Sequence, residues 1–394
     1  MEDLEEPVAY MGQDWKMLGF PAEAILIIME HLTDQADASR CMRATRKLIA
    51  PGEKIVLKYP VQITQENLES FCMFIRKDVT RGRFLRDVSF DFTAIESRDV
   101  QTLIETMRHA KNLKKLTVMA PILEADWRVA VALQELTSVE ELIVKGHNPE
   151  MHRFLLNMHC PVRKVHIEYK NPGESGPPTA DMLNSLSRFH GTLEELTADH
   201  VTWLPISKRP ASKFPKLRML HLGNHTIRNS AVLEEALPGL RILKDGNHLK
   251  LGGQPEMIYD RVPWAPLALL HVHPGSTLVR TLCGEVDVLC YDIRDMQDFK
   301  GNVYNNLLHL VQPHQLILKM RRADTEYRNV GQVLSYTPST RIRTLAVAWK
   351  TVNPWGTFSW VNYVVRPTLP LIMIYASYMA FVISEICSER DQGS

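Results

Sequence analysis

One short pattern of apolar residues recurs along this chain and constrains its fold more than any other feature. It is clearest over residues 217–222, Leu-Arg-Met-Leu-His-Leu, where leucine occupies the first, fourth and sixth positions. The alternation of Leu220, His221 and Leu222 predicts a strand that buries one face. Gly223-Asn224 follows and predicts a turn, because both residue types tolerate a positive φ. A single unit of this size cannot bury its own apolar face, so it needs copies on either side.

Copies of the pattern fill most of the chain. They begin at Leu85, Leu113, Val139, Val162, Leu193, Leu217, Leu240, Leu267, Val286, Pro313, Ile342 and Leu369. The copy at Pro313 is the weakest, and Asp245 occupies a core position of its copy. Most of the spacings fall within the period of about 20–29 residues that is typical of leucine-rich repeats. We therefore predict an α/β fold, a leucine-rich-repeat solenoid shaped as a horseshoe with parallel strands on the concave face and helices outside; an ordinary mixed α/β domain is the alternative.

The segment that precedes the array has a different character. Pro21 stands where a first helical turn accepts proline, and Ile25, Ile28, Met29 and Leu32 then recur at helical spacing. A second, polar-faced helix is expected to carry Ala38, Cys41, Met42, Thr45 and Leu48 on its inner face. We expect a turn at Pro51-Gly52, an irregular strand at residues 55–57 and a helix within residues 65–77.

The residues of this segment resemble the F-box, the short helical module of substrate receptors in cullin-RING ubiquitin ligases. The resemblance rests on Leu18, Pro21, Glu23, Ile25, Ile28, Leu32, Asp37, Ala44 and Arg46. The chain departs from the family pattern at Ala24, at Leu48 and in the spacing between Leu18 and Pro21. The resemblance implies that residues 17–49 bind the Skp-type linker, which joins a receptor to the cullin scaffold, through Leu18, Pro21, Ile25, Ile28, Met29 and Leu32. An F-box before a leucine-rich array is a pairing common among fungal proteins; the alternative is a helical cap that covers one end of the solenoid.

The order of these segments predicts five regions. They are a disordered acidic tail (1–16), the F-box-like all-α module (17–50), a transitional or capping segment (51–84), the repeat array (85–387) and a second disordered tail (388–394). The acidic start has no apolar core of a secretory signal. The six cysteines form no Cys-x-x-Cys and suggest neither a disulfide framework nor a zinc site. We expect a cytoplasmic or nuclear location, with a membrane segment in the uncharged residues 367–384 as a weaker alternative to a buried last strand and closing helix.

Charge and motifs argue against several function classes. Lys and Arg number 46 against 45 Asp and Glu, which gives no bulk attraction to nucleic acid. The chain contains no Walker, Gly-x-Ser-x-Gly or His-Glu-x-x-His motif, so we expect neither an enzyme nor a cofactor. His166, His221 and His271 occupy equivalent outward positions on alternate repeats, about 10 Å apart for strands spaced about 4.8 Å. Metal–His bonds are about 2 Å long, so these three cannot share one ion, and His271-x-His273 alone is weak evidence for a metal.

The sequence thus predicts an adaptor that acts by proximity and supplies no catalytic residue. The linker binds residues 17–49, and an unknown target protein binds the concave face. The predicted target-binding residues are Lys145, His166, Glu168, Asp199, His221, Lys244, His271 and His273. Loops around Trp203 and Trp264 are the alternative target site. The alternative function is a leucine-rich-repeat scaffold that is not attached to a ubiquitin ligase.

Overall fold

The structure is a computed structural model, and it describes most of the chain between residues 21 and 365. The described ranges are 21–44, 46–93, 95–146, 149–168, 182–199, 201–203, 212–223, 225–227, 230–246, 262–273, 282–293, 302–320, 342–352 and 358–365. These residues fall into two compact units. The division lies between Ile143 and Val144, and Met158–Cys160 belongs to the first unit.

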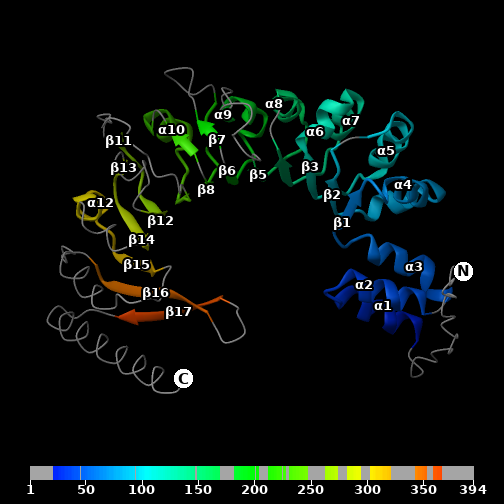
Figure 1. Cartoon of the computed structure of the whole chain (residues 1–394), viewed down its shortest axis with the longest axis horizontal. Coiled ribbons are helices and arrows are strands. Elements are labelled where there is room, and N and C mark those ends of the chain that lie inside the picture. The colour runs from blue at the N-terminus through cyan, green and yellow to red at the C-terminus, as the bar shows by residue number, and fades with distance from the viewer. Residues whose placement is uncertain are drawn as a thin grey trace, which may run out of the picture. The chain divides into compact units, whose positions relative to one another are not determined.

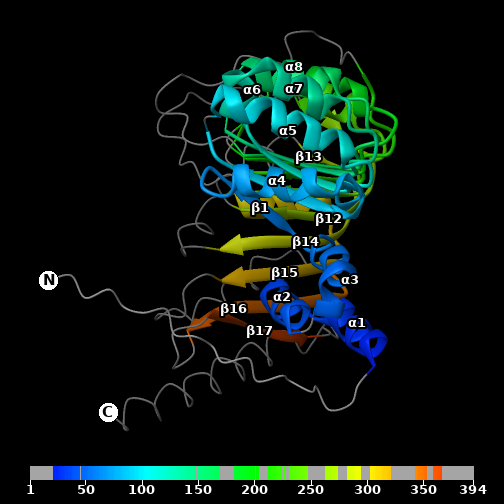
Figure 2. The same cartoon turned by 90° about the vertical axis from the view of Figure 1, so that its right-hand side faces the viewer.

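Three helices open the first unit: α1 (Ala22–His31), α2 (Gln35–Arg43) and α3 (Arg46–Val56). The Asp34 side chain caps α2 by accepting a hydrogen bond from the Ala36 N–H at 2.7 Å. Figure 2 shows the three helices packed against one another. Their shared core consists of Ile25, Met29, Ala38, Leu48 and Ile55.

Three local predictions for this segment are wrong. The second helix was expected to carry both Ala38 and Leu48, but α2 ends at Arg43 and Leu48 lies in α3. Pro51 and Gly52 lie inside α3 and form no turn, and residues 55 and 56 end that helix where an irregular strand was expected. A Cβ on Gly52 would lie 2.7 Å from Cγ of Met42 and 3.2 Å from Cε of Met29. Glycine is therefore needed here for close packing between helices, a requirement that local sequence does not reveal.

The remainder of the first unit alternates strands with helices. Its elements are β1 (Val61–Thr64), α4 (Leu68–Lys77), the 3-10 helix η1 (Val79–Phe84), β2 (Asp87–Asp91), α5 (Ser97–His109), β3 (Lys115–Met119), α6 (Ala120–Ala125), α7 (Trp127–Gln134) and β4 (Glu141–Lys145), at which the chain enters the second unit. The strands are adjacent in the order β1-β2-β3-β4, and β1, β2 and β3 are parallel. Helices α4, α5 and α7 lie on one side of these strands (Figure 1).

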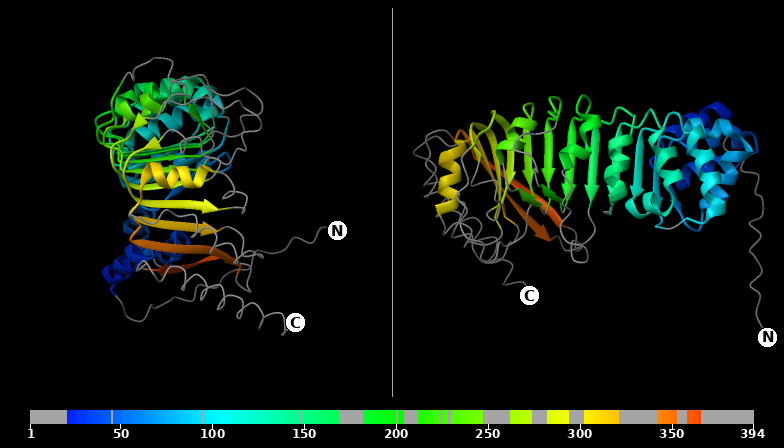
Figure 3. Two further views of the ribbon diagram at one scale, coloured as in Figure 1. Left: turned by 90° about the vertical axis from the view of Figure 1, so that its left-hand side faces the viewer. Right: turned by 90° about the horizontal axis from the view of Figure 1, so that it is seen from above.

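The second unit continues the alternation with shorter connections. Its elements are α8 (Pro149–Asn157), β5 (Lys164–Glu168), α9 (Met182–Ser185), η2 (Ser187–Phe189), β6 (Glu195–Asp199), β7 (Val201–Trp203), β8 (Met219–Leu222), β9 (His225–Ile227), α10 (Ser230–Ala236), β10 (Ile242–Asp245), β11 (Val262–Pro263), β12 (Leu267–Val272), β13 (Leu282–Cys283), β14 (Val286–Ile293), α12 (Asn302–Val311), β15 (Gln315–Met320), β16 (Thr344–Val352) and β17 (Phe358–Val365). The main sheet runs β5-β6-β8-β10-β12-β14-β15-β16-β17. Neighbours are parallel until β17, which pairs antiparallel with β16. Figure 3 shows these strands side by side, from green to orange.

The repeated triplet of the sequence marks the strands. Copies of the pattern coincide with β2, β3, β4, β5, β6, β8, β10, β12, β14, β15 and β16. In the strand of the clearest copy the alternation also holds: Leu220 and Leu222 are fully buried, whereas His221 between them is half-buried. The copy at Leu369 lies outside the described residues. Asp245, which occupies a core position of its copy, is buried. Parallel strands with helical connections thus follow from the pattern.

Two expectations concern membranes and connecting helices. The sequence predicted helices as connections between the parallel strands, and α5, α7 and α8 are such connections. In the described part of the chain, every helix is too short or too polar to span a bilayer. The uncharged segment 367–384 lies outside that part.

Candidate functional site

A row of polar side chains crosses the second unit at the position between the two buried residues of each strand. Strand register aligns His166 with Thr197, Thr197 with His221, His221 with Lys244, Lys244 with His271 and His271 with Cys290. We call these six residues the central polar row. The histidines are separated by one intervening strand each, as the sequence predicted, so the three of them cannot share one metal ion.

Two histidines of the row contact an aspartate on the next strand. His166 Nε2 lies 3.4 Å from Asp199 Oδ2, and His271 Nε2 lies 2.8 Å from Asp292 Oδ1. Each aspartate stands two residues beyond the register partner of its histidine, so the two pairs have the same diagonal arrangement. The second pair is the less exposed, with 25% of the His271 side chain and 12% of the Asp292 side chain accessible. Charge-assisted hydrogen bonds of this kind are stronger where water is excluded.

Gly223 makes room for the side chain of Asp199. An added Cβ on Gly223 would lie 1.7 Å from Asp199 Oδ1. The Asp199 carboxylate therefore lies over Gly223, which follows the neighbouring strand β8. Among the described glycines only Gly146 has a left-handed φ, of 93°, so the expected reason for Gly223, a positive φ, is wrong. Close approach of a side chain is the reason that the structure gives.

The environment moves the pKa values of two histidines in opposite directions. Burial lowers the pKa of His221, and the nearby positive charge of Lys244 acts in the same direction, while Asp199 opposes them. Burial by itself also lowers the pKa of His271, but the hydrogen bond to Asp292 and the contact with Cys290 outweigh it and raise that pKa to about 9. At neutral pH, His271 is therefore the charged histidine of the two.

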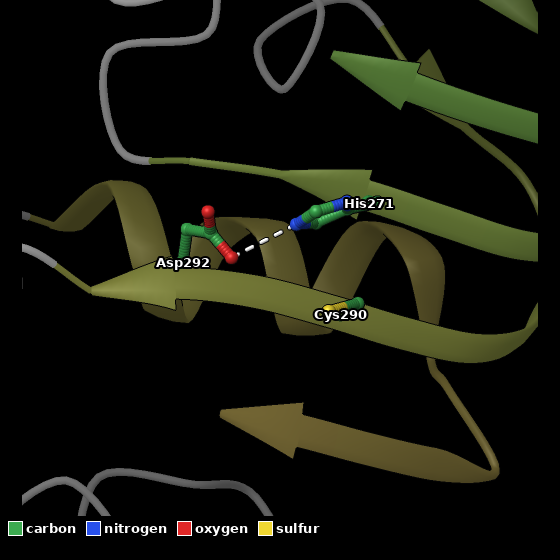
Figure 4. Close-up of side chains that lie close together, drawn as sticks. All are labelled: His271, Cys290 and Asp292. Atoms are coloured by element: carbon green, nitrogen blue, oxygen red, sulfur yellow. Dashed lines mark hydrogen bonds and ion pairs between the residues drawn. The ribbon is translucent and has the colours of Figure 1, made fainter. Parts of the chain in front are cut away.

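His271, Cys290 and Asp292 form a cluster of three potential metal ligands. One ligand atom from each residue lies within 4.8 Å of the other two. Figure 4 shows His271 reaching toward the Asp292 carboxylate, with Cys290 on the same strand as Asp292. Sequence reasoning compared only histidines with one another and missed Cys290 and Asp292. The signal was present in the repeat alignment, because Cys290 occupies the central polar row and Asp292 occupies the position of Asp199.

The predicted target-binding residues divide into two groups. Lys145, His166, Glu168, Asp199, His221, Lys244 and His271 are half-buried on the strands, where a partner could contact them. His273 is only 3% exposed, so the prediction that it contributes to an exposed surface is wrong. It lies one residue beyond the end of β12, where side chains no longer follow the alternation of the strand. Of the alternative loop sites, Trp264 is 7% exposed and lies in the core, and the side chain of Trp203 lies outside the described residues.

The predicted linker-binding residues of α1 also divide. Ile25 and Met29 are buried in the core of the three helices, Ile28 and Pro21 are exposed, and Leu32 is half-buried. Leu18 lies outside the described residues. Tyr59 holds the end of α1 in place, since its hydroxyl donates to the carbonyl oxygen of Met29 or Leu32, at 2.9 and 2.6 Å.

One exposed isoleucine on α1 was not predicted. Ile27 is 59% exposed and lies beside Ile28, which is 47% exposed. The unbroken run of apolar residues 25–29 was the signal, because a helix with apolar residues on every side cannot bury all of them within a small module.

Comparisons with known proteins add no assignment. The geometry above is therefore the ground for any functional proposal, together with the resemblance carried by the sequence. No protein-family model matches the chain, and no curated protein sequence does.

Proposed function

We propose that this protein is a substrate-recognition adaptor of a Skp–cullin–F-box ubiquitin ligase. In this proposal α1, α2 and α3 bind the Skp-type linker, and the polar strand face of the second unit binds a target protein. The observation that carries the proposal is the exposure of Ile27 and Ile28 on a helix whose other face, with Ile25 and Met29, is already buried.

The exposed pair on α1 is suited to a partner protein. Fully burying an isoleucine side chain is worth about 1.5–3 kcal/mol, so Ile27 and Ile28 together offer a substantial gain on docking. The core of the three helices and the Tyr59 hydrogen bonds hold the helix in place before a partner arrives. A preformed apolar face reduces the ordering cost of association.

The strand face supports the second half of the proposal. The central polar row and its aspartates combine positive, negative and neutral groups on rigid strands. Mixed charge of this kind fits a polar protein surface, whereas nucleic acid would favour a continuous basic stripe. An adaptor of this design accelerates modification by holding the target near the ubiquitin-carrying enzyme.

The buried position of Ile25 decides how the linker contact is tested. Charging Ile25 would unfold the three helices, because an unpaired buried charge costs several kcal/mol. The sharper change is Ile27→Asp with Ile28→Asp, which alters the exposed face and leaves the core intact. The matched control is Met73→Asp on α4, where a similarly exposed apolar side chain (46%) lies outside the three helices.

The measurement is affinity purification of the tagged full chain followed by mass spectrometry. We expect linker and cullin peptides with the unaltered protein and the Met73→Asp variant, and their loss with the double variant at an unchanged melting temperature. Equal linker recovery with the double variant would refute the proposed face. Absence of the linker from the unaltered protein would favour a scaffold that is not attached to a ligase.

The target face has its own test in the same experiment. Replacing Glu168, Asp199 and Lys244 by Gln, Asn and Gln removes three charges from the strand face while keeping similar volumes. We expect proteins that co-purify with the unaltered chain to be lost while linker peptides remain. Unchanged recovery of those proteins would place target binding elsewhere.

A further inference from the structure

Two adjacent strands place three different metal-binding side chains at one point of the sheet. His271 on β12 is the register partner of Cys290 on β14. Asp292 is two residues beyond Cys290, and residues at this spacing lie on the same face of a strand. The arrangement is therefore fixed by backbone pairing of the sheet and requires no loop to close around it.

The separations within this cluster match the size of a small metal centre. In a tetrahedral zinc site with bonds of about 2.0–2.3 Å, ligand atoms lie about 3.3–3.7 Å from one another. The ligand atoms of His271, Cys290 and Asp292 all lie within 4.8 Å of each other. His271 Nε2 and Asp292 Oδ1 are 2.8 Å apart. An ion entering between them has to widen this distance by about half an ångström, which a side-chain rotation supplies.

We infer that His271, Cys290 and Asp292 form a binding site for one divalent d-block cation, with zinc as the best-fitting ion. A thiolate is a soft ligand that disfavours magnesium and calcium, whereas one nitrogen, one sulfur and one oxygen suit zinc and its close relatives. The ion takes the place of the thiol proton of Cys290 and of the Nε2 proton of His271, and both protons pass to the solvent. Bound as thiolate and carboxylate, Cys290 and Asp292 also balance the two positive charges of the ion.

The neighbouring charges set the strength of the site. Lys244 is the register partner of His271, and Lys319 is the register partner of Asp292. Both cations oppose a bound metal, so the expected affinity is lower than that of a closed site with four protein ligands. Cys290 is 3% exposed, while the His271 side chain is 25% exposed and the Asp292 side chain 12%. The ion enters from the strand face, and three protein ligands leave a fourth position for water or a ligand from a partner, as in open zinc sites.

The sheet contains a natural comparison for this cluster. His166 and Asp199 repeat the diagonal pair on β5 and β6, but Thr197 occupies the position that Cys290 has. The first pair therefore has a histidine and a carboxylate without the thiol, and its closest approach is longer, 3.4 Å. Among the described residues, the complete set of three ligand types occurs at His271, Cys290 and Asp292.

The test is a cobalt titration of the full chain after treatment with a chelator and reduction by a phosphine. We expect one equivalent of Co²⁺ to give a near-ultraviolet thiolate-to-cobalt band with the visible bands of a tetrahedral site, and one equivalent of Zn²⁺ to displace it. Cys290→Ser removes the thiolate band. Asp292→Asn weakens binding at least tenfold, because loss even of an outer partner of a metal ligand costs about 10–100-fold.

A control variant is titrated in the same way, and the melting temperature of each protein is measured. Cys160→Ser alters a buried cysteine of the first unit and leaves the titration unchanged. Zn²⁺ raises the melting temperature of the unaltered protein, as expected for a ligand of the native state, and does not raise that of Asp292→Asn at the same concentration. If Cys290→Ser fails to fold, the test uses Asp292→Asn, because asparagine preserves the shape of the aspartate side chain.

Either of two results overturns the inference. One is the absence of saturable cobalt binding by the unaltered protein below millimolar concentration. The other is a thiolate-to-cobalt band that persists in Cys290→Ser, or cobalt affinity in Asp292→Asn equal to that of the unaltered protein. Either outcome would assign the metal to other residues of the chain.

Discussion

Replacing Gly223 by alanine tests whether the Asp199 carboxylate is held close to the backbone of residue 223. In Gly223→Ala, the new Cβ would lie 1.7 Å from Asp199 Oδ1, 2.7 Å from its Cγ and 3.1 Å from its Cα. The carboxylate has to rotate away, and the approach of the new methyl group to the Asp199 backbone stays tight after it has done so. Overpacking of this kind costs about 1–3 kcal/mol.

An opposing effect reduces the net loss. Replacing glycine by alanine restricts the unfolded chain and stabilises a compatible site by about 0.4–1 kcal/mol. The displaced carboxylate also loses its interaction with His166, which is worth under about 1 kcal/mol for a pair this exposed. We therefore expect Gly223→Ala to destabilise the protein by about 1–2 kcal/mol. For a unit of this size this corresponds to a melting temperature lower by about 2–4 °C.

Alanine substitutions at two other glycines provide reference values for this change in melting temperature. Gly191 has no atom within 4 Å of an added Cβ, so Gly191→Ala leaves the melting temperature unchanged or raises it. At Gly239 the added Cβ would lie 2.3 Å from the backbone oxygen of Pro215. A carbonyl held in the backbone cannot rotate away, so Gly239→Ala is the most damaging of the three.

Calorimetry and a double-mutant cycle check the reasoning. Asp199→Ala removes the side-chain oxygens that meet the new Cβ, so the double variant with Gly223→Ala is less destabilised than the sum of the two single changes. The relief is partial, because the backbone of residue 199 remains in place. A Gly223→Ala melting temperature equal to that of Gly191→Ala, or strict additivity in the cycle, would refute the close approach.

Three other predictions follow from burial and charge. Leu220→Ala lowers the free energy of unfolding by about 2–5 kcal/mol, whereas His221→Ala lowers it less because this side chain is only half-buried. Equal shifts in the denaturant midpoint would contradict the strand register. Arg81→Ala costs about 1.5–3 kcal/mol, because it removes a charge-assisted hydrogen bond to Glu53 at 2.6 Å in a site where 17% and 15% of the two side chains are exposed. Arg81→Lys should not restore the melting temperature. NMR titration should place the pKa of His271 above 6.5 and that of His221 below 6.5. The stability that His271 contributes is therefore present below pH 6.5 and is lost as the pH rises to about 9. The lowered pKa of His221 has the opposite effect, because it reduces the stability of the fold as the pH falls below 6.5. Both histidines titrating near 6.5 would contradict these environments.

Much of the fold could be predicted because the strand signal is local. In most repeats, the buried fourth and sixth residues and the less buried residue between them determine the strand and its faces by themselves. The central polar row was accessible for the same reason, since equivalent positions of successive parallel strands lie side by side. His273 fell outside this rule because it follows the last residue of β12, where alternation no longer applies.

Other features depended on packing between distant residues. Pro51-Gly52 has the composition of a turn, yet the packing of Met42 and Met29 against Gly52 places it inside a helix. Which apolar residues of α1 are buried depended on where α2 and α3 lie, so the sequence could not separate Ile25 from Ile28.

The sequence by itself determined the repeating strands, the buried leucines and the polar character of the strand face, because each of these follows from residues only a few positions apart. Only the tertiary structure decided which of these polar side chains come close enough to share a hydrogen bond or a metal ion. Cys290 and Asp292 come from one strand and His271 from another, and their separations depend on the register between β12 and β14. Backbone hydrogen bonds between strands set that register, and those bonds join residues about twenty positions apart, beyond the reach of any local pattern.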